Sequence, residues 1–169
     1  ASASAGGIGV NGSSYIWAEN CEFGATGSSA AKAAIRVAAG NTNTLYLTHC
    51  NFDTGYNISY TGLNNAVRAV NCNFSGKVAG ATLTDIGHCH WGSSGGGLVL
   101  PATCNAVKIH NNQFDGLTLA INVTATTVNG LQITDNDFNQ GTTGIDLTAC
   151  GSSTSGGNMI KGNHFYGTD

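Results

Sequence analysis

Residues 71–74 read NCNF, and this phrase occurs, with small changes, seven times along the chain. In its first four copies the second letter is Cys, and in the last three it is Asn. The closing aromatic residues are separated by 17 to 29 residues. The other copies are NCEF at 20–23, HCNF at 49–52, HCHW at 88–91, NNQF at 111–114, DNDF at 135–138 and GNHF at 162–165.

Each copy lies between two stretches in which apolar and polar residues alternate. Alternation with a period of two indicates strands with one buried face, and no segment keeps the 3.6-residue period of an amphipathic helix. A unit of two strands repeated every twenty or so residues is typical of a solenoid. An antiparallel barrel or sandwich is the alternative, although it does not explain why one phrase returns at one phase of every unit. The second strands are expected at 34–37, 57–60, about 79–83, 97–100, 120–123 and 144–147.

The composition excludes several classes of protein. Charged residues make up 9% of the chain, against roughly 25% in ordinary soluble domains. The net charge is −3 and there is no basic run, so nucleic acid is not an expected partner. No apolar stretch is long enough for a membrane span, and no signal peptide is recognised. Few charges and many hydroxyl and amide side chains favour an extracellular location or a virion surface.

The repeated strand, N-x-F phrase, glycine turn and G-I-x-L strand resemble the right-handed parallel β-helix family of pectate lyases, polygalacturonases and phage tailspikes. The resemblance runs from about Ile8 to Phe165. It implies an all-β solenoid of about seven coils, and we expect residues 1–169 to form one domain. Neither end shows a capping segment, so we expect both ends to be uncapped. The expected partner is the chain itself, stacked head to tail or as a trimer.

The alternation predicts which residues face the interior. Residues seven, five and two positions before each aromatic, and the aromatic itself, should point inward. Stacked asparagines can bond to one another and to turn backbone, and cysteine fits the same slot as a small apolar residue. We favour free thiols, with disulfides between neighbours as the alternative, and leave the state of Cys104 and Cys150, outside the column, open. The predicted interior column is Cys21, Cys50, Cys72, Cys89, Asn112, Asn136 and Asn163.

The outward positions on the same strands carry aromatic and charged side chains. Rings that stack on sugars and polar groups that fix their orientation form glycan-binding faces. The alternative is a solvated sheet face with a few protecting aromatics. The candidates for glycan binding are Trp17, Tyr46, Arg68, Asp85, Lys108 and His110.

Catalysis is the runner-up function. A glycosidase needs two carboxyl groups at a set separation, and a lyase needs a base beside a group that neutralises the substrate's charge. Asp85 with Arg68, His88 and His90 is one candidate cluster, but the catalytic motifs and calcium-binding acids of the resembled enzymes are absent. We expect a non-catalytic structural and recognition module, without cofactor or metal, in a virion tail or cell-surface fibre. A fragment of a polysaccharide-degrading tailspike or lyase is the alternative.

Overall fold

A computed structural model describes residues 7–10, 12, 14–24, 33–37, 43–60, 66–81, 83–92, 97–100, 103–124, 127–148 and 157–167. Within these ranges all regular structure is strand. None of these residues belongs to a helix long and apolar enough to cross a membrane.

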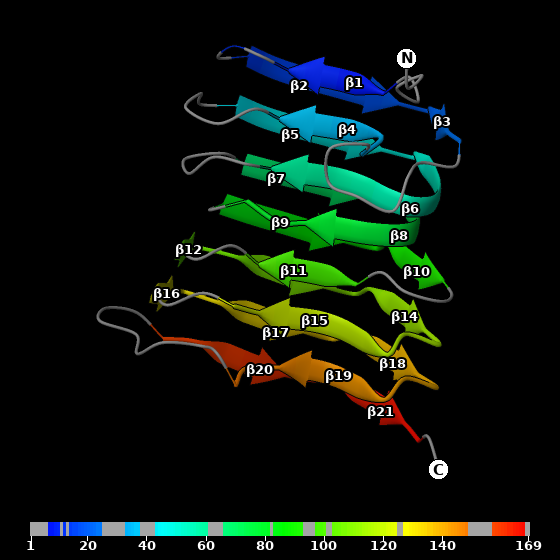
Figure 1. Ribbon diagram of the computed structural model, residues 1–169. Helices are drawn as coiled ribbons and strands as arrows, with labels where there is room; N and C mark the ends of the chain where they lie inside the picture. Colours follow the sequence, from blue (N-terminus) through cyan, green and yellow to red (C-terminus); the bar gives the residue numbers. More distant parts are fainter. Residues whose placement is uncertain are drawn as a thin grey trace.

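One face of the molecule is a parallel sheet built from the strand that precedes each aromatic phrase (Figure 1). We call it the seven-stranded sheet. Its strands, in spatial order, are β2 (Ser14–Glu19), β5 (Asn43–Thr48), β7 (Ala66–Val70), β9 (Leu83–Gly87), β13 (Lys108–His110), β17 (Gln132–Thr134) and β20 (Met159–Lys161).

A twelve-stranded sheet forms the rest of the wall and consists of two ladders joined through its long strands β6 and β8. The first, the aromatic ladder, contains β3 (Glu22–Phe23), β6 (Asn51–Tyr60), β8 (Asn73–Ala79), β10 (His90–Gly92), β14 (Gln113–Asp115), β18 (Asp137–Asn139) and β21 (His164–Tyr166). The second, the closing ladder, adds β1 (Ile8–Val10), β4 (Ile35–Val37), β11 (Leu98–Leu100), β15 (Leu119–Val123) and β19 (Thr143–Asp146) to the ends of β6 and β8.

A short pair, β12 (Thr103–Asn105) with β16 (Thr127–Asn129), completes the strands. The chain is therefore a parallel β-solenoid, as the repeat predicts. Figure 1 shows its coils stacked in sequence order from the N-terminal to the C-terminal end. It makes about five turns, fewer than the seven coils expected.

The interior is filled by the residues that the alternation assigns to it. Leu45, Val67 and Ile109 have no exposed surface, and the seven closing aromatics form one continuous stack. Neighbouring ring centroids in this stack are 4.5 to 5.0 Å apart, the spacing that parallel strands impose. Trp91, at the centre, is fully buried between Phe74 and Phe114.

The third coil differs from the prediction. Its second strand is the end of β8, where Val78 pairs with Ile58 and Leu98, rather than a segment at about 79–83. The chain turns here without leaving the strand. The backbone N–H of Gly76 donates to the side-chain oxygen of buried Asn57 at 2.8 Å. A Cβ at Gly76 would collide with the backbone of Gly55.

Candidate functional site

The six candidate glycan-binding residues all lie on the seven-stranded sheet. Its register aligns Trp17 with Tyr46, Tyr46 with Arg68, Arg68 with Asp85 and Asp85 with Lys108. Five of the six therefore form one line across five neighbouring strands, which we call the outer stripe. The sixth, His110, is on β13 two residues after Lys108 and points to the same side of the sheet.

The upper part of the stripe is aromatic. The Trp17 and Tyr46 rings meet edge to face, with centroids 5.6 Å apart and planes at 64°. Trp17 is 77% exposed, and Tyr15 beside it is 79% exposed. The Arg68 guanidinium carbon lies 5.6 Å from the Tyr46 centroid, within the range of a cation–π contact. This contact holds the Arg68 guanidinium over the Tyr46 ring, where its N–H groups can donate to a ligand.

Below Arg68 the stripe becomes a shallow hollow. Arg68, Asp85 and Lys108, together with Thr84 and Ala106, line a volume of about 190 Å³. Among the described residues, neither Arg68 nor Lys108 forms a recorded ion pair. Two cations therefore flank the hollow on β7 and β13, two strands apart.

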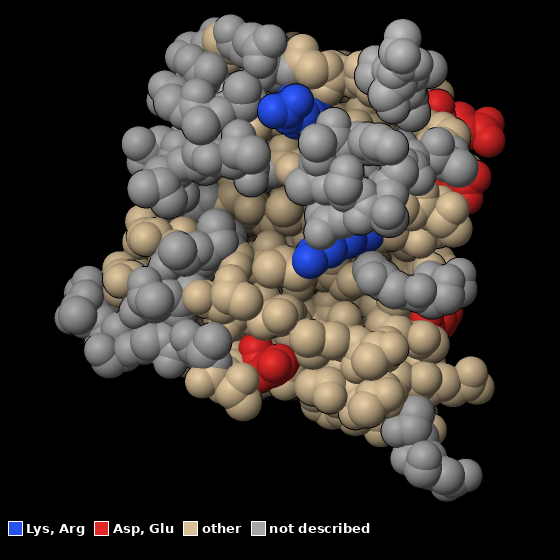
Figure 2. All heavy atoms as spheres, viewed as in Figure 1, with Lys and Arg blue, Asp and Glu red and all other residues tan. Residues whose placement is uncertain are grey.

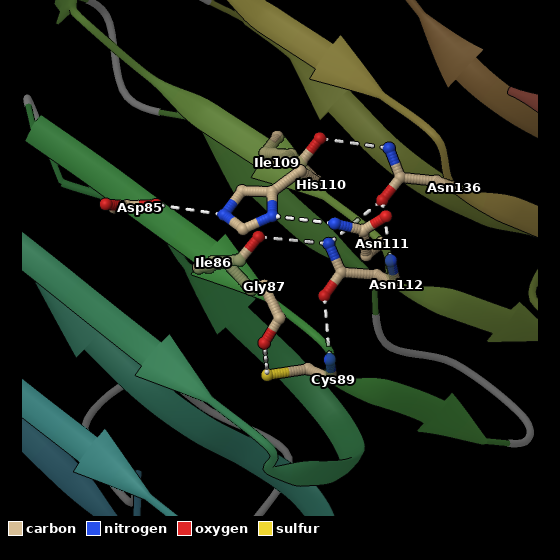
Figure 3. Close-up of polar contacts among 9 residues, drawn as sticks. All are labelled: Asp85, Ile86, Gly87, Cys89, Ile109, His110, Asn111, Asn112 and Asn136. Atoms are coloured by element: carbon tan, nitrogen blue, oxygen red, sulfur yellow. Dashed lines mark hydrogen bonds and ion pairs between the residues drawn. The ribbon is translucent and has the colours of Figure 1, made fainter. Parts of the chain in front are cut away.

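Asp85 is held by the next coil. His110 Nε2 lies 3.3 Å from Asp85 Oδ1, and His110 Nδ1 lies 3.2 Å from the Asn111 side-chain nitrogen (Figure 3). The imidazole can take this position only because Gly87 has no side chain: a Cβ there would occupy the space of the ring. Sequence analysis named Asp85 and His110 separately, but the glycine between them was not recognised as the reason they meet.

The predicted cluster of Asp85 with Arg68, His88 and His90 is formed only in part: Arg68 and Asp85 are neighbours across two strands and line the same hollow, but His90 lies elsewhere. His90 belongs to β10 in the aromatic ladder, on a different sheet from Asp85, and its Nε2 lies 2.8 Å from Asp115 Oδ2. His88 occupies the turn between the two sheets. The His88 ring meets the His110 ring edge to face, with centroids 5.8 Å apart, so it lies beside the residue that contacts Asp85. The prediction was wrong for His90, because the turn carries it to the other sheet.

The interior column lies at the turns that join the seven-stranded sheet to the aromatic ladder. Asn112 and Asn136 are buried. The Asn112 amide nitrogen donates to the Ile86 carbonyl at 3.1 Å and to Asn136 Oδ1 at 2.9 Å, and the Asn112 oxygen accepts from the Cys89 backbone N–H (Figure 3). Asn136 repeats this arrangement with Ile109 and Asn163.

The cysteine part of the column carries free thiols at Cys21, Cys50, Cys72 and Cys89. Burial raises the pKa of the Cys50 thiol, and the hydrogen bond to Cys72 together with burial raises the pKa of Cys89. The same hydrogen bond, with Cys89, lowers the pKa of the Cys72 thiol to about 7. Cys50, Cys72 and Cys89 are all buried, and a thiol without access to solvent is a poor nucleophile, so we interpret the column as structural. Cys104 is also buried, and Cys150 lies outside the described residues.

A second regularity, missed by sequence analysis, explains the first letter of each phrase. The residue three positions before every aromatic has a positive φ, between 52° and 68°. This conformation is strained for most residues and is tolerated best by Gly, Asn, Asp and His. The residues are Asn20, His49, Asn71, His88, Asn111, Asp135 and Gly162. The residue types at this position are the signal in the sequence from which the turns could have been predicted. They indicate that His49 and His88 are turn residues.

The outer side of the aromatic ladder carries a group of hydrogen-bonded polar side chains around Asp115. Asp115 accepts from Gln113 at 2.9 Å and Asn139 at 2.8 Å, besides its contact with His90. Partial burial acts to raise the pKa of Asp115, but hydrogen bonds from Asn139, His90 and Gln113 outweigh it and lower the pKa. Figure 2 shows acidic groups mostly along one edge of the molecule and Lys or Arg nearer the middle of the face in view.

Within the described ranges, no three His, Cys, Asp or Glu side chains are placed to hold a metal ion. No protein-family model, curated protein or solved structure matches the chain.

Proposed function

We propose that this solenoid is a recognition module that binds glycans along the outer stripe without cleaving them. The observation that carries the proposal is the edge-to-face pair of Trp17 and Tyr46, continued by Arg68 and by the hollow that Asp85 and Lys108 share with it. Trp17 is 77% exposed beside Tyr46, and sugar rings stack on aromatic surfaces of this kind.

The chemistry of the stripe fits an extended, hydroxyl-rich ligand. The aromatic faces would cover the apolar faces of pyranose rings, and the two cations would donate hydrogen bonds to hydroxyl, carboxylate or sulfate oxygens. Because the stripe crosses successive strands at about 4.8 Å each, it runs along the solenoid axis, which favours a polymer lying lengthwise over a small molecule in a deep pocket. Because the hollow is shallow, both ends of such a polymer can extend beyond it.

The biological setting that we propose is a fibre on a virion tail or cell surface, in the manner of the tailspikes that the repeat resembles. Few charged residues and a rigid stack of parallel strands support an extended shaft that presents a binding face to solvent. This setting also implies an extracellular or virion-surface location.

One observation favours a polysaccharide-degrading enzyme as the second candidate. Asp85 and His110, an acid and a base in contact, adjoin a hollow lined by Arg68 and Lys108. General acid–base chemistry needs groups of this kind at one site. Against it, Asp85 is the only carboxylate at the hollow among the residues that the structure describes, where a glycosidase would need two.

Calorimetric titration of the chain with a panel of neutral and anionic polysaccharides tests the proposal. We expect binding to at least one of them, and a loss of up to about tenfold in affinity for Trp17→Ala, because a stacked ring contributes about 0.5–1.5 kcal/mol. Tyr166→Ala is the matched control, since Tyr166 is an exposed aromatic residue (56%) on β21 of the aromatic ladder, away from the stripe. Binding that is unchanged in Trp17→Ala would contradict the proposal.

A turnover assay on the same polysaccharides separates the two candidates. A recognition module releases neither reducing ends nor unsaturated uronates. Sustained release that Asp85→Ala abolishes would replace the first candidate with the second.

A further inference from the structure

The charges in the middle of the outer stripe alternate in sign. Arg68, Asp85 and Lys108 are register partners on β7, β9 and β13, which are successive strands of the seven-stranded sheet. The stripe is uncharged on either side of these three residues, at Tyr46 on β5 and at Gln132 on β17. It therefore presents a positive, a negative and a positive charge at intervals of one strand, about 4.8 Å.

Asp85 does not neutralise the two cations. Among the described residues, no ion pair joins Asp85 to Arg68 or to Lys108. Asp85 contacts the neighbouring column of the sheet instead, where its Oδ1 lies 3.3 Å from His110 Nε2 (Figure 3). No hydrogen bond is recorded from the Arg68 or Lys108 side chain to a described residue, and both residues are exposed. The N–H groups of both cations are therefore available to a ligand.

The contacts of His110 define what Asp85 can do. His110 Nδ1 lies 3.2 Å from the Asn111 side-chain nitrogen, and an amide nitrogen only donates. Nδ1 therefore accepts, and Nε2 carries the proton that Asp85 Oδ1 accepts. Because this contact uses Oδ1, the second carboxylate oxygen of Asp85 can accept a hydrogen bond from a ligand.

The spacing of these charges matches the spacing of sugars in a polymer. A pyranose unit in an extended polysaccharide has nearly the length of one strand spacing, about 4.8 Å, so consecutive sugars meet Arg68, Asp85 and Lys108 in turn. A carboxylate or sulfate forms charge-assisted hydrogen bonds at either cation. The same group beside Asp85 is repelled, whereas a hydroxyl there donates to the carboxylate.

We propose that the ligand is a linear polysaccharide in which acidic sugars alternate with neutral ones. Its acidic groups contact Arg68 and Lys108, and the neutral sugar between them donates a hydroxyl to Asp85. In this register the sugar that stacks on Tyr46 is also neutral. The inference rests on the proposed function, because it requires a polysaccharide lying lengthwise on the stripe, and it adds the charge pattern of that ligand.

Three oligosaccharides of equal length test the charge pattern by calorimetric titration. A hyaluronan fragment carries an acid on every second sugar, an oligogalacturonate carries one on every sugar, and a cello-oligosaccharide carries none. We expect the hyaluronan fragment to bind tightest, by about fivefold over each of the others, which is the size of effect that an exposed ion pair gives.

Substitutions at the three charges test the assignment of each position. Asp85→Asn keeps an acceptor for His110 and removes the negative charge, so it should raise the affinity for oligogalacturonate by about fivefold and cancel the preference for hyaluronan. Arg68→Gln and Lys108→Gln should each weaken hyaluronan binding by up to about fivefold. Arg36→Gln is the matched control, since Arg36 is exposed on β4 of the closing ladder, and it should change none of the affinities.

The outcomes separate this inference from the proposed function. Binding that needs Trp17 but is tightest for the neutral or the fully acidic oligosaccharide overturns the alternating pattern and leaves the stripe as the binding face. A preference for hyaluronan that survives Asp85→Asn also overturns the pattern. Binding that does not need Trp17, or no binding to any polysaccharide, overturns the proposed function and this inference together.

Discussion

The two sides of the seven-stranded sheet follow opposite rules. On its inner side the columns are made almost entirely of apolar residues, as in the buried series Leu47, Ala69 and Ile109. The exception is buried Thr84, which follows Val67 and whose hydroxyl bonds to the backbone of Ala81. On its outer side the residue changes at every strand, from Trp17 to Tyr46 to Arg68 and onward. Both sides share one backbone, so the packing of side chains between coils accounts for the apolar character of the inner side.

This contrast separates the residues that determine stability from those that are available for recognition. A side chain between two coils must match its neighbours above and below in size and hydrogen bonding, and this requirement produces the repeat. An outward side chain meets solvent, so its identity is available for recognition. We therefore expect inner substitutions to change stability and leave binding intact in the folded protein, and outer substitutions to do the reverse.

The largest effect is expected in the aromatic stack. Phe114→Ala should lower the free energy of unfolding by about 3–5 kcal/mol, because it leaves a cavity between Trp91 and Phe138. Phe74→Ala, in the cysteine half, should cost a similar amount, since its ring is equally buried. Urea denaturation measures both. A loss below 1 kcal/mol in either variant would break the argument that the stack is the core.

The next effect is expected in the interior column. Asn136→Ala removes the acceptor of the Asn112 backbone N–H, at 2.9 Å, and the donor to the Ile109 carbonyl, at 3.0 Å. Leaving such groups unpaired should cost on the order of 3 kcal/mol. Cys72→Ala, the control at the same column position, should cost about 1 kcal/mol, because its thiol makes only weak contacts, such as that to the Val70 carbonyl at 3.4 Å. Equal losses would contradict the distinction between the two halves.

On the outer side, Tyr46→Ala should change stability by less than about 0.5 kcal/mol and weaken glycan binding about tenfold, since it removes a ring and frees Arg68. Calorimetric titration gives the affinity, and thermal unfolding gives the stability. A large loss of stability with unchanged affinity would show that Tyr46 stabilises the fold and does not bind the ligand.

A smaller gain is expected at a strained turn. Gln140 has a φ of 53°, whereas Gly116, at the equivalent turn one coil earlier, has 65°. Gln140→Gly should stabilise the protein by about 1 kcal/mol, since a left-handed conformation penalises residues with a Cβ, and Gly116→Ala should destabilise it by a similar amount. Urea midpoints that move in the opposite directions would contradict this.

The smallest effect is the pH dependence of Asp115. Its pKa is lowered in the folded chain, so its contribution to stability is present above the unfolded value of about 3.9 and is lost as the pH falls through the folded pKa. The difference in urea midpoint between the natural chain and Asp115→Asn should therefore be larger at neutral pH than in acid below that range. A difference that does not change with pH would contradict the role of the carboxylate.

The sequence predicts the inner side well because packing repeats it. The period of the phrase, the alternation and the Cys-to-Asn column follow from residue types that must match from coil to coil, and the observed register agrees with them. The exception is the third coil, where a strand that bends at Gly76 has no separate turn for the pattern to indicate.

The outer side was only partly predictable. The line of Trp17, Tyr46 and Arg68 follows from strand alternation, but the pairing of Asp85 with His110 depends on the empty space at Gly87. The pairing of His90 with Asp115 joins side chains 25 residues apart across two coils. No periodic signal reports such contacts, because each occurs once.

Tryptophan fluorescence tests whether the outer stripe is the binding face. The chain has two tryptophans, and Trp91→Phe, which keeps a ring in the stack, leaves Trp17 as the only emitter. We predict that a bound polysaccharide protects Trp17 from quenching by acrylamide. Binding that calorimetry detects while Trp17 remains fully quenchable would contradict the account and move the site away from the stripe.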